Sequence, residues 1–75
     1  MESGVLSRAE RYTDLLIAAF RALADSPNSA PACDHIRQGY RRRNVERHMI
    51  YFRVTEYGIA IIRVLHDRMD ALRHL

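Results

Sequence analysis

The spacing of apolar residues along this chain changes once, and that change limits the folds that the chain can adopt. In the first third, apolar residues recur at spacings of three and four, which aligns them along one side of an α-helix. These residues are Val5, Ala9, Tyr12, Leu16, Ala19, Phe20 and Leu23. From His48 onward the spacing becomes two, which is the period of a β-strand. The pattern predicts an α+β fold, with the helix before the strands.

Local signals bound the predicted helix. Ser7 with Glu10 fits a capping box at its start, and Ser3 is an alternative cap. Pro27 lacks the amide hydrogen that would continue the helical hydrogen bonds. We predict a helix that begins at one of the two serines and ends at Ala24. A loop that contains both prolines of the chain follows it.

Three extended segments follow the loop. Residues 48–54 alternate between apolar side chains on one face and mixed side chains on the other. Residues 55–58 form a turn whose glycine can take a positive φ, and residues 59–66 form a second strand rich in β-branched residues. Residues 36–45 supply a third, arginine-rich strand. The order predicts an N-terminal helix packed on a three-stranded antiparallel sheet.

The last predicted strand is apolar on both faces. Strict alternation gives two sets, one with Ile59, Ile61 and Leu65 and the other with Ala60, Ile62 and Val64. A strand that is covered on both sides has this pattern, and one helix covers a single face. We therefore expect a second copy, a partner segment or the C-terminal residues of this chain to cover the other face.

Length and charge narrow the class of protein. Seventy-five residues suffice for one domain with a thin core, so we expect marginal stability and dependence on a partner or on self-association. The net charge is +3, from twelve arginines against nine acidic residues. This surplus suits a nucleic acid or an acidic protein partner, and it is equally compatible with a solvated basic face.

The sequence also indicates a compartment. A single cysteine, Cys33, excludes an internal disulfide, fits a reducing cytoplasm and is expected to be a packing residue rather than a nucleophile. The chain opens on acidic Glu2 rather than on a basic segment, so no secretory signal is expected. No apolar run is long enough to span a bilayer. We expect a soluble, cytoplasmic protein.

The densest charge run is Arg41-Arg42-Arg43. On a strand, Arg41 and Arg43 share one face and Arg42 takes the other, so the three cannot form one patch. They can present a basic surface to an acidic protein segment or to an RNA backbone. They can equally protect an edge strand from aggregation. The sequence leaves both interpretations open.

Two histidines could meet if the long strands pair as a hairpin. Counting outward from the turn, however, places His48 opposite Leu65 rather than opposite His66. No cysteine or carboxylate joins the two histidines at ligand spacing, so we do not expect a zinc site. Structural hydrogen bonds are favoured over a general acid or base role.

Two arginines interrupt the apolar strands. We expect Arg53 and Arg63 to pair with carboxylates, for which Glu46, Glu56 and Asp70 are available, and an RNA-facing role is the second interpretation.

The chain ends in a short charged segment with apolar residues at a spacing of three. Met69, Leu72 and Leu75 share this spacing, and we expect them to form a final helical turn that packs on the sheet.

Four segments carry a family resemblance. Residues 36–41 resemble an "lr-x-G-x-R" entry to a sheet, and residues 47–54 resemble an "RH-x-I-x-Y/F-R-V" central strand. Residues 59–70 are similar to an "I-x-I-x-RVLH-x-R-M-D" ending, and the N-terminal helix resembles one that closes with "LA-x-x-P". These are features of the ParE toxin family, in the ParE/RelE superfamily. Family members open with a strand and a helix that nothing here matches, so we expect one ParE-like domain over residues 1–75 without them.

The resemblance implies a function. It points to the toxin of a type II toxin–antitoxin system, which binds DNA gyrase, stabilises a broken-DNA state and is neutralised by its cognate antitoxin in a hetero-oligomer. It implies no cofactor, metal, membrane or small-molecule substrate. One alternative is a RelE-type ribosome-dependent mRNA endonuclease, for which Arg53, Arg63 and His66 are available. The absence of lysine and of any aromatic residue after Tyr57 favours a non-enzyme. The other alternative is an inactive truncated toxin that only binds antitoxin.

Candidate residues for binding a target or partner lie in the sheet and near the chain end. They are Arg41, Arg43, Arg53, Arg63, His66, Arg68, Met69 and Asp70. The last three are included because the C-terminal region of the resembled family is implicated in toxicity.

Overall fold

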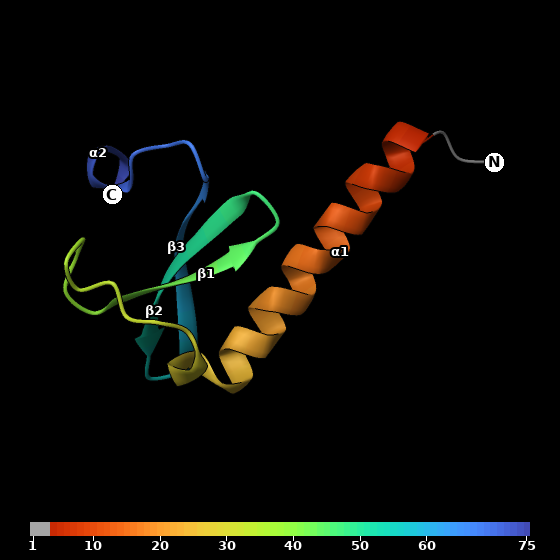
Figure 1. Ribbon diagram of the computed structural model, residues 1–75. Coiled ribbons are helices and arrows are strands. Elements are labelled where there is room, and N and C mark those ends of the chain that lie inside the picture. The colour runs from red at the N-terminus through yellow and green to blue at the C-terminus, as the bar shows by residue number, and fades with distance from the viewer. Residues whose placement is uncertain (1–3) are drawn as a thin grey trace.

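A long helix leads into a three-stranded antiparallel sheet, and a short helix follows the sheet (Figure 1). The computed structural model describes the backbone of residues 4–75 and the side chains from residue 10 onward. The elements are α1 (Gly4–Asp25), a 3₁₀ turn η1 (Pro27–Ser29), β1 (Tyr40–Val45), β2 (His48–Thr55), β3 (Gly58–His66) and α2 (Ala71–His74). The predicted α+β arrangement is confirmed. No helix of the described residues is long and apolar enough to cross a membrane.

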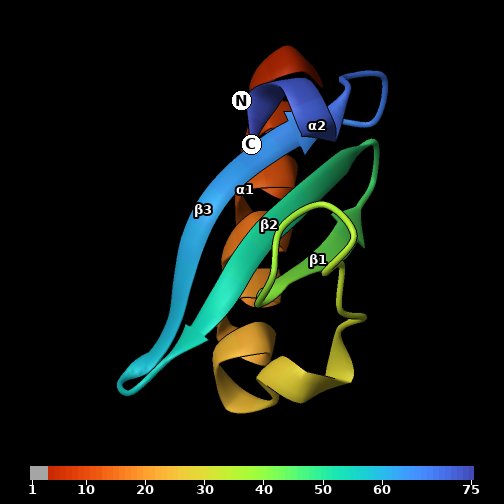
Figure 2. The ribbon, with the colours of Figure 1, turned by 90° about the vertical axis from the view of Figure 1, so that its left-hand side faces the viewer.

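Helix α1 begins and ends close to the predicted residues. Ser7 lies inside the helix rather than at its start, so the predicted capping box is wrong, and the alternative cap Ser3 lies outside the described residues. At the other end, the amide of Ser26 still donates to Ala22 O at 3.0 Å before Pro27 opens η1. Figure 2 shows α1 behind the sheet, so it covers one face only.

Strand β1 is shorter than predicted. It begins at Tyr40, because the segment before it is folded into turns. The amide of Ile36 donates to Cys33 O at 2.9 Å, and the amide of Gly39 donates to the Asp34 carboxylate at 2.8 Å. Gly39 has a φ of 84°, which glycine adopts without a steric penalty. The extended prediction for residues 36–39 is therefore wrong.

A β-bulge in β3 changes which side chains face α1. Strand β2 pairs with β3 regularly from the turn up to Phe52↔Ile61, and the next pair is Tyr51↔Arg63. Ile62 is thus an extra residue, and the alternation of faces is interrupted there. Val64 packs in the cluster under α1, and Leu65 packs on the opposite face. The prediction that grouped Leu65 with Ile59 is therefore wrong.

The core has two parts, one on each face of the sheet. Under α1, the buried residues are Leu23, Ala30, Ile50 and Phe52. On the opposite face they are Cys33, Tyr51 and Leu65, with Ile36, Tyr40, Ala71 and Leu75 packed against them. The loop before β1 and the C-terminal residues therefore cover the second face. Of the three occupants expected there, the C-terminal segment of this chain is the one observed.

Arginine side chains also bind backbone oxygens of the C-terminal segment. Arg63 Nη1 donates to His74 O at 2.8 Å, and Arg37 donates to Leu75 O through Nε at 3.2 Å and Nη2 at 2.8 Å. The exposed fractions of Met69 and Leu72 are 42% and 69%, so their predicted packing on the sheet is wrong. Leu75, the third residue of the predicted set, does pack against the buried cluster, together with Ala71. Apolar packing of these two residues and the arginine hydrogen bonds therefore hold this end in place together.

Candidate partner-binding site

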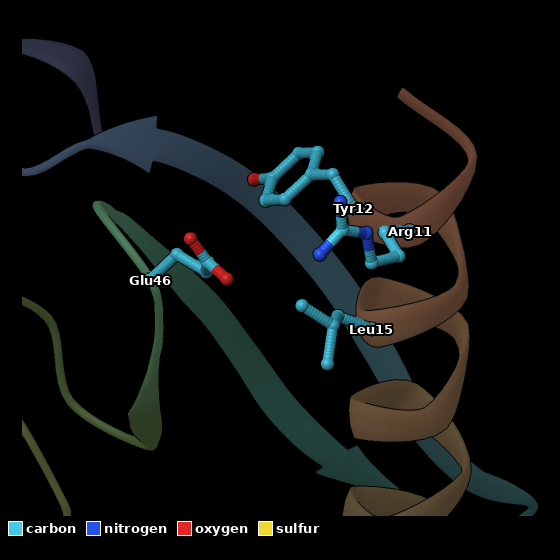
Figure 3. Close-up of a pocket in the computed structure, with 4 residues that line it drawn as sticks. All are labelled: Arg11, Tyr12, Leu15 and Glu46. Atoms are coloured by element: carbon cyan, nitrogen blue, oxygen red, sulfur yellow. The ribbon is translucent and has the colours of Figure 1, made fainter. Parts of the chain in front are cut away.

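A groove runs between α1 and the neighbouring part of the sheet. Near the β1–β2 turn it is a cleft of about 410 Å³ lined by Arg11, Tyr12, Leu15 and Glu46 (Figure 3). A second hollow of about 380 Å³ shares Leu15 with it. This hollow is lined by Leu15, Ala18, Ala19, Ala22, Arg43, Asn44 and Val45. Because Leu15 belongs to both, we treat them as one feature, the α1–β1 groove.

The groove combines an apolar wall with charged rims. Three alanines leave α1 without bulky side chains, so another backbone could approach it closely. Leu15 is 44% exposed, which is unusual for a leucine that faces its own sheet. Arg11, Arg43 and Glu46 supply charges of both signs at the edges. The arrangement suits an apolar protein segment with acidic flanks better than a small polar molecule.

At the upper end of the groove, α1 contacts the sheet through aromatic rings. The ring centroids of Tyr12 and His48 are 5.0 Å apart with the planes tilted by 43°. His48 in turn meets His66 edge to face, with centroids 5.3 Å apart. The hydroxyl of Tyr12 and Nδ1 of His48 are buried, and no described residue forms a hydrogen bond with either atom. Burial, and secondarily the Glu46 carboxylate, raise the pKa of Tyr12 above its ordinary value.

Sequence reasoning considered that the two histidines could meet, but it missed their direct opposition and the contact with Tyr12. His48 lies directly opposite His66, not opposite Leu65 as predicted, because the bulge at Ile62 adds one residue to β3. His66 Nδ1 lies 2.9 Å from the Asp67 carboxylate, and the amide of Arg68 donates to the same nitrogen at 3.2 Å. The described residues contain no group of three or more His, Cys, Asp or Glu side chains placed to hold a metal ion.

The arginine run divides as the sequence predicts. Arg41 and Arg43 lie opposite Phe52 and Ile50 of β2, which face α1, and Arg42 lies opposite Tyr51 on the other face. Arg41 Nη1 donates to the carbonyl of Ala30 at 2.7 Å, so this side chain braces the loop. Arg43 is exposed and lines the α1–β1 groove, which leaves it available to a partner.

Arg53 and Arg63 lie on the sheet face away from α1, since they pair with Ala60 and Tyr51. Arg63 donates to His74 O, and in the described part of the chain neither arginine forms an ion pair. The predicted pairing with carboxylates is therefore wrong. One predicted acceptor, Asp70, is occupied elsewhere, because its side chain accepts the amide of Leu72 at 3.0 Å as the N-cap of α2.

The remaining candidates form no single site. Arg68 and Met69 are exposed in the connection to α2, and Asp70 caps that helix. His66 belongs to the ring cluster on the α1 side. Cys33 is fully buried, and burial raises the pKa of its thiol, as expected for a packing residue rather than a nucleophile. The structure thus separates the candidate residues. Of these, only Arg43 lines the α1–β1 groove, and the other described residues of the groove were not selected by sequence reasoning.

Comparison with known proteins assigns the family. The family described as "ParE toxin of type II toxin-antitoxin system, parDE" matches residues 2–71. The chain is 42% identical over 71 residues to Toxin ParE1 of Mycobacterium tuberculosis strain H37Rv, covering 93% of this chain and 72% of that protein. It is 34% identical over 70 residues to Toxin ParE1 of Caulobacter vibrioides, with the same coverage. This chain belongs to the ParE toxin family of type II toxin–antitoxin systems.

Proposed function

We propose that this chain is a cytoplasmic toxin that inhibits DNA gyrase by protein–protein binding, and that a cognate antitoxin neutralises it. Membership of the ParE toxin family is the observation that carries the proposal. It supports a protein partner, the antitoxin. Gyrase as the target rests on the resemblance of the strand and tail motifs to that family.

The α1–β1 groove supports a protein as the neutralising partner. Leu15 is exposed beside three alanines, and the exposed side chain of Arg43 lies at the rim. An amphipathic antitoxin segment would bury the leucine and place an acidic side chain near Arg43 or Arg11. Its binding would also cover the cleft in which the Tyr12 hydroxyl lacks a partner.

The position of three side chains argues against the ribonuclease alternative. RNA cleavage needs basic groups and a general acid or base around one phosphate. Arg53 and Arg63 lie on the sheet face away from α1, whereas His66 lies on the face toward α1. Arg63 is also engaged with the carbonyl of His74. The residues available for catalysis therefore do not converge, which favours binding as the mechanism.

The deciding experiment is supercoiling of relaxed plasmid by purified gyrase, with this chain added alone and then with its antitoxin. Inhibition or accumulated linear DNA that the antitoxin reverses supports the proposal. No effect on gyrase, combined with codon-linked mRNA cuts in primer extension, identifies the endonuclease instead. No effect on either, with antitoxin binding retained, identifies an inactive toxin that only binds antitoxin.

A further inference from the structure

The turn between β2 and β3 carries the most exposed large apolar side chain of the described residues. Tyr57 is 96% exposed, whereas the other exposed large apolar side chains lie between 38% and 69%. Figure 2 shows this turn at the lower left, where it projects past the start of β1 and lies apart from α1. The tyrosine ring therefore lies in solvent at one end of the sheet.

The fold does not require a tyrosine at this place. Glycine, asparagine and aspartate are the residues that two-residue hairpin turns favour. The amide of Tyr57 donates to Thr55 Oγ1 at 3.3 Å, a contact that any residue except proline could make. In the β1–β2 turn, the corresponding place is occupied by Arg47. An aromatic ring held in water is unfavourable for the free protein, so its position suggests a role in binding.

Two further features lie at the same end of the sheet. Arg53 is exposed on the face away from α1, and Val54 is 47% exposed on the face toward α1. Tyr40, the first residue of β1, lies opposite Arg53, and the residue before it is Gly39, which has no side chain to cover Val54. A Cβ added to Gly39 would meet nothing within 4 Å. A hollow of about 290 Å³ lies there, lined by Asn28, Ala32, Asp34, Gly39, Tyr40, Arg41 and Val54.

Arg53, Val54, Tyr57 and the hollow beside Val54 together form what we call the hairpin-end surface. Tyrosine and arginine are enriched among the residues that dominate the binding energy of protein interfaces. A tyrosine also supplies a large, rigid contact area and loses little conformational entropy when it is fixed. Strand β2 pairs with β3 along its whole length, so the turn has a firm support. These features suit a protein partner better than a small molecule, since small-molecule pockets enclose most of their ligand.

The hairpin-end surface is separate from the α1–β1 groove. The hollow beside Val54 and the groove share no lining residue among those described. Tyr57 and Glu46 lie at opposite ends of β2, whose eight residues span about 26 Å at the rise of an extended strand. An antitoxin segment that fills the groove beside Glu46 therefore does not itself reach Tyr57.

We propose that the hairpin-end surface binds the protein that this toxin inhibits, with Tyr57 inserted into an apolar socket of the target and Arg53 facing a carboxylate at the rim of that socket. The carboxylate follows from the charge of Arg53, which forms no ion pair with a described residue. This inference rests on the proposed function, because it requires that the chain acts by binding a target protein. Target binding and antitoxin binding are then separable by mutation.

Gyrase supercoiling with variants of the turn tests the proposal. Tyr57→Ser should raise the toxin concentration that half-inhibits gyrase by at least about tenfold, as expected for the loss of a dominant interface tyrosine. Tyr57→Phe keeps the ring and should stay close to the unmodified chain. Arg47→Ser is the matched control, because it changes the corresponding place of the other turn. Circular dichroism should show all three variants folded, since both turn side chains are exposed.

Antitoxin binding gives the second readout. Isothermal titration of the turn variants should give affinities within about twofold of the unmodified chain, because distant surfaces act independently. Leu15→Lys, in the groove, should show the converse and lose antitoxin affinity while it still inhibits gyrase. Inhibition by Tyr57→Ser at the same concentration as by the unmodified chain would contradict the proposal. An equal loss of both activities in Tyr57→Ser would place the turn in the antitoxin interface and overturn the proposal as well.

Growth arrest on induction separates this inference from the proposed function, since the readout does not depend on which protein is the target. If the unmodified chain arrests growth without inhibiting gyrase, gyrase is refuted as the target, and loss of arrest in Tyr57→Ser at equal protein level still supports the hairpin-end surface. Arrest that persists in Tyr57→Ser refutes this surface whatever the target is. An unmodified chain that neither arrests growth nor inhibits gyrase has no target to bind, and the inference fails with it.

Discussion

His48 and His66 face each other across β2 and β3, with ring centroids 5.3 Å apart and planes at 82°. They form a non-hydrogen-bonded pair, because the neighbouring pair is joined by the bond from Asp67 N to Arg47 O. The His48 ring also contacts the Tyr12 ring in a tilted arrangement, so this pair supports α1 near Tyr12. Lower down, Leu23 and Phe20 pack α1 on the sheet. The helix is thus held at two places with the α1–β1 groove beside them.

Antitoxin binding should weaken when a charged side chain is placed on the apolar wall of the α1–β1 groove. We expect Leu15→Lys to weaken antitoxin binding by about tenfold or more, since a lysine there cannot be buried against an apolar segment. Ile17→Lys is the matched control, because Ile17 is 41% exposed on α1 but does not line the groove. Isothermal titration with purified antitoxin measures both. Equal loss in the two variants, or none in either, would show that the antitoxin binds elsewhere.

Removing the hydroxyl of Tyr12 should not destabilise the protein. The hydroxyl is buried without a partner, so Tyr12→Phe should raise the free energy of unfolding by up to about 1 kcal/mol. Urea denaturation measures the change. Tyr12→Leu removes the ring and should be destabilising, because the contact with His48 is lost. A clear loss of stability in Tyr12→Phe would indicate that the hydroxyl has a hydrogen-bond partner in solution.

The same tyrosine predicts a dependence on alkaline pH. Burial, with a smaller contribution from Glu46, raises the pKa of Tyr12 in the folded chain above its value in the unfolded chain. The folded state therefore holds this proton more tightly. Its contribution to stability is fully present below about pH 10, the unfolded pKa, and is lost as the pH rises through the folded pKa. Unfolding followed from neutral to alkaline pH should show a smaller decline in Tyr12→Phe than in the unmodified chain.

The core under α1 depends on Phe52. Its side chain is fully buried, so Phe52→Ala should cost about 3–5 kcal/mol, enough to unfold a domain of this size at room temperature. Val54 lies two residues further along the same strand and is 47% exposed. Val54→Ala should therefore cost less than about 1 kcal/mol. Thermal melts of the two variants give the comparison, and similar losses would mean that the face near Val54 is covered in solution.

The cap of α2 should control whether this helix stays on the sheet. Asp70 accepts the amide of Leu72, and Asp70→Ala should cost about 1 kcal/mol of local stability. Asp70→Asn keeps an N-cap acceptor without the charge and should behave like the unmodified chain. Amide hydrogen exchange in residues 71–75 reports the difference. Fast exchange in both variants would assign the effect to the charge rather than to the cap.

One two-residue turn connects β1 to β2 and another connects β2 to β3, and the two turns differ in backbone strain. Glu46 has a φ of 58°, a left-handed conformation that costs most residues about 1 kcal/mol, whereas asparagine tolerates it better. Glu46→Asn should therefore raise the melting temperature. Glu56 occupies the equivalent place in the β2–β3 turn without a positive φ, so Glu56→Asn should have little effect. Equal shifts in both would point to the lost charge instead.

The sequence by itself determined the elements and the family. Periods of three to four and then two gave the helix and the sheet, because each depends on residues close together in the chain. The motifs of residues 47–54 and 59–70 indicated the ParE family, which the comparisons confirm. The prediction that something must cover the second face of the sheet was also correct, and the C-terminal segment does so through Ala71 and Leu75.

Only the tertiary structure decided on which face of the sheet each side chain lies and which residues come together in a site. One extra residue, Ile62, reverses the side of every later side chain in β3, and no local signal marks it because alternation assumes regular pairing. The direct opposition of His48 and His66 follows from it. The tertiary structure also decided the partners of two arginines, since Arg41 and Arg63 each donate to a backbone oxygen eleven residues away in the chain. The acceptors, Ala30 O and His74 O, lie outside the strands that carry the two arginines, so the acceptors reach the guanidinium groups only once the chain has folded.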